Sequence, residues 1–320
     1  MPRTSSPTLV ARLAVALAAL VPAAVGAAAQ CGPRSLDRPR PREHLLVTPA
    51  WLAAHARDAG LVILQVGLDG FRDARIPGAR PIDPMALTAG DHDLAPPERL
   101  RDQIESLGVS SDSRVVLYGD PWHTGLVFWT LEYLGMDDRV AVLDGGLPRW
   151  RAEGRPVATG AAPPATRGRF TPRPRADVLA TADWIRERLD SRRVVVIDAR
   201  TAAEYAGTAR EPLPRTGHIP GARHLDWSTT FTRPTAAADS GVSSPLVSAA
   251  RLAELFEAEG VGPGTEVVLY CTVGLRASHL YLVARYLGYT ARVYDGSWSE
   301  WSRRADLPIA TGPATRGEMR

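Results

Sequence analysis

A cysteine at the end of an apolar run is the strongest candidate for chemistry in this sequence. The stretch VVLYCTVGLRASH, residues 267–279, contains Cys271, one of only two cysteines in the chain. Backbone N–H groups of the following loop, the dipole of the helix expected after it and a guanidinium in the loop all favour a thiolate over a thiol. We therefore predict a reactive thiolate in a cradle that also binds an oxyanion, formed by Thr272, Val273, Gly274, Leu275 and Arg276. The alternative is a buried structural thiol.

Further candidates surround a second apolar run, VVVID at 194–198. Arg200 either binds an anionic substrate or forms an ion pair with Asp198 or Glu204, and both interpretations stay open. Asp198 is expected to support its loop and not to act as a base. His218, in the segment GHIPGA, is expected to make a structural hydrogen bond. Ser278 either caps the helix after the loop or donates to the sulfur.

Several classes of site are excluded by what the sequence lacks. No histidine or cysteine follows the spacing of a metal site, and Asp91-His92-Asp93 is only a weak metal candidate. The chain has no lysine, which removes a P-loop lysine and a lysine Schiff base. The formal net charge is +3, and no segment concentrates charge for nucleic-acid binding. We therefore expect no metal, no cofactor and no nucleic-acid partner.

The elements that must position these residues occur twice in the chain. IPGAR, VVLY, YLG and DG each recur in the same order, at 76–80 and 219–223, 115–118 and 267–270, 133–135 and 286–288, and 144–145 and 295–296. Such order predicts an internal duplication.

In the second copy we predict strands over 194–198, 266–270 and 291–296, and helices over 248–260 and 277–289. This alternation is typical of an α/β fold with a parallel sheet flanked by helices. Cys271 then lies just beyond the carboxyl end of a strand, where such sheets bind ligands.

The stretches VVVIDARTAAEYAGT, RTGHIPGARHLDW, VVLYCTVGLRASHLYLVARYLGY and VYDGSWSEW resemble the rhodanese family in its two-domain sulfurtransferase form. The resemblance covers roughly residues 45–311 and implies tandem rhodanese-like domains. It also implies that thiosulfate forms a persulfide on Cys271, and that a small thiophilic acceptor such as cyanide or a thiol removes the sulfur. The alternatives are 3-mercaptopyruvate as donor, or a persulfide carrier or binding module with little turnover.

The first copy resembles the non-catalytic domain of such proteins. Gly119 stands at the position of the cysteine, Gln65 at that of Asp198 and Arg75 at that of His218. Trp122 and His123, on its degenerate loop, could line the cleft. Mercaptopyruvate sulfurtransferases typically carry a serine where this chain has Val273 and a histidine where it has Arg75. The resemblance therefore favours thiosulfate as donor.

The expected organisation is a signal peptide at 1–29, a Pro/Arg-rich leader at 30–44, a non-catalytic domain at 45–157, a linker at 158–176, a catalytic domain at 177–311 and a flexible tail at 312–320. Arg3 and Arg12, an apolar stretch and Ala27-Ala28-Ala29 before Gln30 are typical of a secretory signal. We expect a periplasmic or secreted protein. The alternative is a membrane-anchored lipoprotein with a lipid anchor at Cys31.

Overall fold

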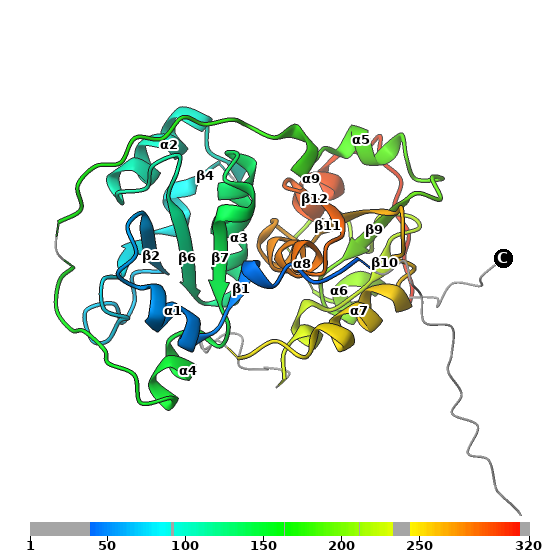
Figure 1. Ribbon diagram of the computed structural model, residues 1–320. Coiled ribbons are helices and arrows are strands. Elements are labelled where there is room, and N and C mark those ends of the chain that lie inside the picture. Colours follow the sequence, from blue (N-terminus) through cyan, green and yellow to red (C-terminus); the bar gives the residue numbers. More distant parts are fainter. Residues whose placement is uncertain (1–38, 91–92, 163, 211, 233–243, 314–320) are drawn as a thin grey trace, which may run out of the picture. The chain divides into compact units, whose positions relative to one another are not determined.

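The computed structural model describes residues 39–90, 93–162, 164–210, 212–232 and 244–313 (Figure 1). The predicted signal peptide, Cys31, Asp91, His92 and residues 314–320 of the predicted tail lie outside these ranges. Within the part that is described, no helix has the length and apolarity needed to span a membrane.

The first half of the described chain forms a five-stranded parallel sheet in the order β1-β7-β6-β2-β3. Its strands are β1 (Leu46–Val47), β2 (Leu61–Val66), β3 (Arg80–Ile82), β6 (Arg114–Gly119) and β7 (Val140–Leu143). The helices are α1 (Pro49–His55), α2 (Pro97–Ser106), α3 (Pro121–Tyr133) and α4 (Gly146–Ala152), with short 3-10 turns η1 (Glu43–Leu45), η2 (Pro84–Leu87) and η3 (Asp137–Arg139). Strands β4 (Thr88–Ala89) and β5 (Asp93–Leu94) form a separate antiparallel hairpin.

The second half repeats this architecture with a parallel sheet in the order β10-β9-β11-β12-β8. Its strands are β8 (Leu179–Ala180), β9 (Val194–Asp198), β10 (Arg223–His224), β11 (Glu266–Tyr270) and β12 (Thr290–Tyr294). The helices are α5 (Ala182–Arg186), α6 (Ala202–Ala206), α7 (Ala249–Ala258), α8 (Leu275–Tyr286) and α9 (Ser297–Arg303), with 3-10 turns η4 (Ala176–Val178) and η5 (Trp227–Thr230). The predicted α/β fold of two similar parallel sheets is confirmed, although α8 begins two residues earlier than its apolar periodicity suggested.

The repeated motifs form the same contacts in both halves. The tyrosine that ends VVLY accepts a hydrogen bond from the backbone N–H of the isoleucine in IPGAR. The distances are 3.1 Å from Ile76 N to Tyr118 Oη and 3.1 Å from Ile219 N to Tyr270 Oη. Each bond ties a central strand to the segment that leads into an edge strand. Buried backbone N–H groups need a partner, so the two motifs recur together.

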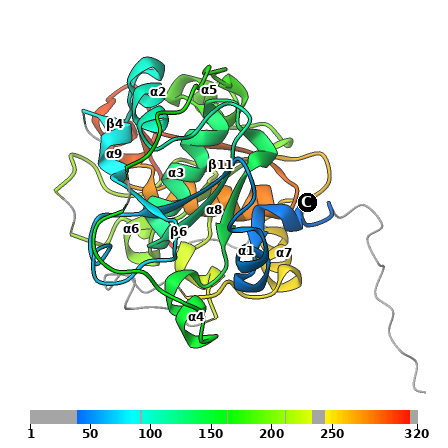
Figure 2. The ribbon, with the colours of Figure 1, turned by 60° about the vertical axis from the view of Figure 1, so that its left-hand side comes forward.

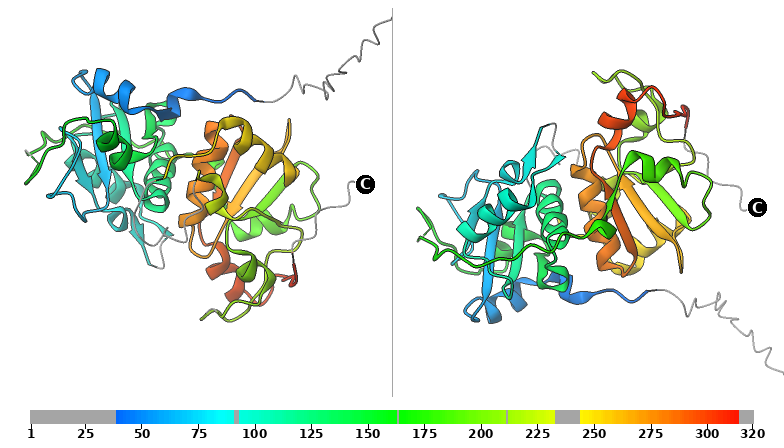
Figure 3. Two further views of the ribbon diagram at one scale, coloured as in Figure 1. Left: turned by 90° about the horizontal axis from the view of Figure 1, so that it is seen from below. Right: turned by 90° about the horizontal axis from the view of Figure 1, so that it is seen from above.

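Helices α3 and α8 pack against each other between the two sheets, as the views in Figures 1 and 3 show. A Cβ atom at Gly125 of α3 would lie 2.5 Å from the backbone nitrogen of His279, so only glycine allows this approach. Further along, the buried Glu132 accepts hydrogen bonds from Tyr281 Oη at 2.5 Å and from Arg285 Nε at 2.9 Å. This buried ion pair fixes the register of the two helices, because neither charge has water to replace its partner.

Candidate active site

Cys271 directly follows strand β11 and is a free cysteine with 1% of its surface exposed. Three residues later Gly274 caps the N-terminus of α8 with φ of +86°, in the left-handed region that glycine adopts at no steric cost. A Cβ atom there would also lie 3.3 Å from both the carbonyl oxygen and Oδ1 of Asp295. The glycine thus lets the chain turn sharply from strand to helix around the sulfur.

The loop beyond the cysteine presents an unused set of hydrogen-bond donors. Within the described ranges, the backbone N–H groups of residues 272–276 have no acceptor, whereas the N–H of Cys271 itself donates to Ser297 Oγ at 3.2 Å. Successive N–H groups at a helix N-terminus bind anions and favour negative charge. The loop therefore supplies N–H donors of the kind that the predicted cradle needs, and the binding of a thiolate or an oxyanion there stays a prediction.

The turn of residues 295–299 holds this loop in place. Trp298 N donates to the Cys271 carbonyl at 2.9 Å, and Ser299 N donates to the Thr272 carbonyl at 3.0 Å. Ser297 is fully buried, donates its hydroxyl to the Tyr294 carbonyl at 2.8 Å and has φ of +50°. A serine in this region costs about 1–3 kcal/mol, so the surrounding contacts must compensate for it. These bonds position the cysteine backbone without using the donors of the cradle.

Arg276 is held by an acidic partner on the neighbouring helix α6. Its Nη1 donates to Glu204 Oε2 at 2.8 Å, and its Nη2 donates to Glu204 Oε1 and to Thr272 Oγ1, both at 2.7 Å. The side chains of Arg276 and Glu204 are only 15% and 14% exposed. That Arg276 lies beside the sulfur stays a prediction. The prediction that the Arg276 guanidinium is fully available to thiosulfate needs correction, because the Glu204 carboxylate already binds its Nη1 and Nη2.

Mutual stabilisation keeps both members of this pair charged. Burial alone would raise the pKa of Glu204, but the hydrogen bonds and charge of Arg276, with bonds from Thr201, hold it far below its ordinary value. Burial likewise opposes the charged form of Arg276, whereas the hydrogen bonds and charge of Glu204 and the nearby Cys271 raise its pKa. Glu204 is therefore a carboxylate at neutral pH.

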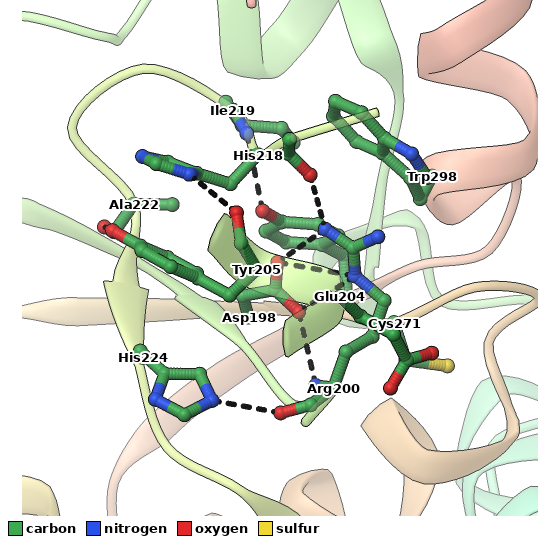
Figure 4. Close-up of polar contacts among 12 residues, drawn as sticks. Asp198, Arg200, Glu204, Tyr205, His218, Ile219, Ala222, His224, Cys271 and Trp298 are labelled. Carbon is green, nitrogen blue, oxygen red and sulfur yellow. Dashed lines mark hydrogen bonds and ion pairs between the residues drawn. The ribbon is translucent and has the colours of Figure 1, made fainter. Parts of the chain in front are cut away.

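Arg200 belongs to a buried ion pair and not to the substrate site, which corrects one of the two open interpretations. Its Nη2 donates to Asp198 Oδ2 at 2.7 Å and to the Gly217 carbonyl at 2.6 Å, and both charged side chains are fully buried (Figure 4). The guanidinium also lies 4.7 Å from the ring centroid of Trp298. Asp198 Oδ1 accepts the backbone N–H of Arg200 at 2.9 Å, so it supports the loop, as expected.

Two other predicted residues make structural contacts. His218 Nδ1 lies 2.8 Å from the Tyr205 carbonyl, and its ring stacks on that of Tyr205 with centroids 3.7 Å apart (Figure 4). Burial lowers its pKa. Ser278 Oγ donates to the Gly274 carbonyl at 2.8 Å. Ser278 therefore stabilises the first turn of α8, and its hydroxyl hydrogen does not point to the sulfur.

The first domain reaches the edge of the site through its hairpin. The backbone N–H of Leu94 in β5 donates to Asp295 Oδ2 at 2.8 Å, across 201 residues of sequence. Figure 2 shows β4 at the same edge of the molecule as α9, which begins two residues after Asp295. Burial raises the pKa of Asp295 to about 7, with Asp93 and Glu300 contributing and Leu94 opposing. Asp295 is thus a carboxyl group that titrates near neutral pH next to the loop.

The loop of the first domain has no room for a cysteine. A Cβ atom at Gly119 would lie 2.4 Å from the Val66 carbonyl oxygen. The carboxylate of Asp120 accepts the N–H groups of Trp122 at 3.1 Å and of His123 at 3.2 Å, so the donors at the start of α3 are already used. Trp122 packs edge-on against Trp227 of the second domain, with ring centroids 5.2 Å apart. The first loop therefore offers neither a thiol nor unused N–H donors at the start of α3, and its lack of catalysis stays a prediction.

Three residues of the site were missed by the sequence analysis: Glu204 as the partner of Arg276, Asp295 and Ser297. Asp295 directly follows β12, Ser297 begins α9, and Glu204 lies in the first turn of α6, the helix that follows β9, so the rule that located Cys271 also applied to them. Glu204 carries a further signal, the spacing T-x-x-E of a capping box with Thr201. Among the described residues, no group of histidine, cysteine, aspartate or glutamate could hold a metal ion.

Comparisons with known proteins point to one family. A model of the rhodanese-like domain matches residues 48–153 and again 181–304. A sulfur carrier protein of Thermus thermophilus is 32% identical over 84% of this chain and 97% of its own length. A thiosulfate sulfurtransferase of Corynebacterium glutamicum is 31% identical over 86% of this chain and 93% of its own. The crystal structure of the protein YnjE superimposes with a TM-score of 0.76 at 25% identity, covering 85% of this chain and 69% of that one.

Proposed function

Because the chain belongs to the rhodanese-like sulfurtransferase family, we propose that it moves the sulfane sulfur of thiosulfate through a Cys271 persulfide to a small thiophilic acceptor such as cyanide or a thiol. The observation that carries this proposal is the loop of residues 272–276. Its N–H groups lack acceptors within the described residues and directly follow a free thiol at the carboxyl end of a central strand.

The chemistry needs a nucleophilic sulfur and a place for developing negative charge. The Cys271 thiolate attacks the outer sulfur of thiosulfate, a new S–S bond forms, and the old S–S bond breaks with its electron pair leaving on sulfite. Cyanide then attacks the outer sulfur of the persulfide, giving thiocyanate and regenerating the thiolate. The N–H cradle stabilises the anionic sulfur in both steps. No proton transfer or further reactant is required.

The choice of thiosulfate over 3-mercaptopyruvate rests on Val273 and Arg75. Arg75 donates to the carbonyl oxygens of Gly160 at 2.7 Å and Ala161 at 3.1 Å within the first half of the chain. These bonds engage both terminal nitrogens of Arg75 within the first half of the chain. We therefore expect kcat/KM to be at least tenfold higher for thiosulfate than for 3-mercaptopyruvate, or about 1.4 kcal/mol. The opposite order would reassign the donor.

A second candidate function is that of a persulfide carrier with slow turnover. It is favoured by the identity to the sulfur carrier protein of Thermus thermophilus. The two functions share the persulfide and differ in the rate of its transfer to small acceptors.

The deciding experiment is intact-mass measurement after incubation with thiosulfate. We expect one added sulfur atom, its loss on addition of cyanide, and no addition to a Cys271→Ser variant. Steady-state thiocyanate production then separates the enzyme from the carrier, since a carrier loads sulfur but releases it to cyanide slowly. A Cys271→Ser variant with normal turnover would refute the assignment.

We also propose that the protein is exported to the periplasm or secreted. The basic and apolar pattern of residues 1–29 supports this, with a lipid anchor at Cys31 as the alternative. Fractionation of cells, with the mass of the mature N-terminus, tests it. A mature chain that starts at Met1 in the cytoplasmic fraction would contradict export.

A further inference from the structure

The carboxylate of Glu204 contacts Thr272 and Arg276 of the loop that follows Cys271, and this position suggests a role in the choice of sulfur donor. We propose that Glu204 sets the relative use of sulfur donors, because its carboxylate reduces the advantage of a doubly charged donor such as thiosulfate over a singly charged sulfane-sulfur compound such as an organic thiosulfonate. This inference rests on the proposed function of Cys271 and names the residue that sets the balance between two classes of sulfur donor.

The first argument concerns the hydrogen-bonding capacity of Arg276. A guanidinium has five N–H donors. Three of them go to Glu204 and to Thr272, as described above. Nε–H and one hydrogen of Nη1 make no hydrogen bond within the described part of the chain. These two donors suffice for a single oxyanion contact, but the bidentate face of the arginine is already occupied by a carboxylate.

The second argument concerns charge. The cation of Arg276 and the carboxylate of Glu204 cancel, and neither side chain is more than 15% exposed, so solvent screens them only in part. The pair of Arg276 and Glu204 therefore presents no net positive charge to a sulfur donor that approaches the Cys271 thiolate. A second negative charge on the donor gains little attraction and adds repulsion from both the thiolate and the carboxylate. A singly charged donor avoids that repulsion and still finds the neutral N–H donors of the loop.

The third argument is that Glu204 cannot easily swing away when a dianion arrives. Its Oε2 accepts the backbone N–H of Thr201 at 2.8 Å and the Thr201 hydroxyl at 2.7 Å, which closes a capping box at the start of α6. Its Oε1 also lies 3.4 Å from Thr272 Oγ1. Displacing the carboxylate would leave the first turn of α6 without its cap.

The experiment compares two donors that differ by one charged oxygen. Thiosulfate is the dianion, and methanethiosulfonate carries a methyl group in place of that oxygen. With either donor the S–S bond breaks onto the leaving group, sulfite or methanesulfinate, while Cys271 gains one sulfur. The measured quantity is the ratio of kcat/KM for thiosulfate to kcat/KM for methanethiosulfonate.

Glu204→Gln removes the charge and keeps a residue that also serves in a capping box. We expect this variant to raise the ratio about tenfold, equivalent to about 1.4 kcal/mol. The matched control is Glu266→Gln. Glu266 pairs with Arg292 at 2.5 Å and begins strand β11, at the opposite end from the cysteine, so the ratio should stay within about twofold of the wild type.

A second variant tests the proposal in the opposite direction. Arg276→Met leaves the Glu204 carboxylate without its cation, so the ratio should fall about tenfold. An unchanged ratio in both Glu204→Gln and Arg276→Met, with Cys271 still loaded by each donor, would overturn the role of Glu204 and leave the proposed function intact. A wild-type protein that neither donor loads would instead overturn the proposed function, and this inference with it.

Discussion

Replacing Asp295 by asparagine should change how the stability of the protein depends on pH. Burial raises the pKa of this carboxyl group from an ordinary value of 3.8 to about 7. The folded protein therefore keeps the proton over a range where the unfolded chain has already lost it. The contribution of Asp295 to stability is fully present below about pH 4, falls as the pH rises, and is lost once the pH passes about 7.

The magnitude follows from the size of the shift. One pKa unit corresponds to about 1.4 kcal/mol, so a shift of about three units costs up to about 4 kcal/mol at pH 8. The asparagine side chain in Asp295→Asn would avoid this penalty, and its amide oxygen can still accept the 2.8 Å hydrogen bond from Leu94 N. The difference in unfolding free energy between Asp295→Asn and wild type should be near zero at pH 4 and should favour the variant by a few kcal/mol at pH 8.

Urea unfolding at pH 4, 5, 6, 7 and 8 measures this difference directly. Taking the difference between two proteins cancels the titration of all other groups. Asp190→Asn, on an exposed turn, provides the control and should stay within about 0.5 kcal/mol of wild type throughout. A difference for Asp295→Asn that is constant over the whole range would refute the argument, as would a variant that loses stability only at high pH.

Three further predictions concern the loop, the packing of the two central helices and the first domain. Arg276→Ala should slow alkylation of Cys271 by iodoacetamide about tenfold and raise KM for thiosulfate, since the Glu204 carboxylate is left without its cation and disfavours both the thiolate and the dianion; coincident rates would leave the arginine without a role. Glu132→Gln should lower the unfolding free energy by about 3–5 kcal/mol in urea, because Arg285 stays buried without its counterion; a loss below about 1 kcal/mol would contradict this. Gly119→Cys should still take up one sulfur per chain from thiosulfate, since a side chain there meets a backbone carbonyl at 2.4 Å; two sulfurs would show that the first loop can be activated.

The backbone features of the site could be predicted from sequence because they depend on local patterns. The apolar run before Cys271 indicated a buried strand, and its abrupt end placed the thiol at the sheet edge that binds ligands. The paired motifs indicated two copies, and the structure explains them through the bonds of Tyr118 to Ile76 and of Tyr270 to Ile219. Local patterns of this kind can be recognised in sequence because a buried strand and the turn after it require the same types of residue wherever they occur.

Partners of charged side chains were harder to predict, since they depend on which loops fold over one another. Arg200 and Arg276 both looked like ligands for an anion. The first pairs with Asp198 two residues away, and the second with Glu204 across 72 residues. Asp295 takes its hydrogen bond from a hairpin of the other domain, 201 residues distant. Sequence spacing carries no information on contacts of this kind, although the sheet edge on which each residue lies could be inferred.

The packing of α8 has a consequence for anyone who wishes to work with half of this protein. Residues 277–285 are buried around the whole circumference of the helix, because one side faces its own sheet and the other faces α3. Cutting the chain in the linker would expose an apolar stripe that begins six residues after Cys271, and would leave Arg285 without Glu132. The first domain can thus be seen as a folding partner built into the chain. A minimal version of the half that contains Cys271 would need polar residues on the exposed side of α8 before it could be handled alone.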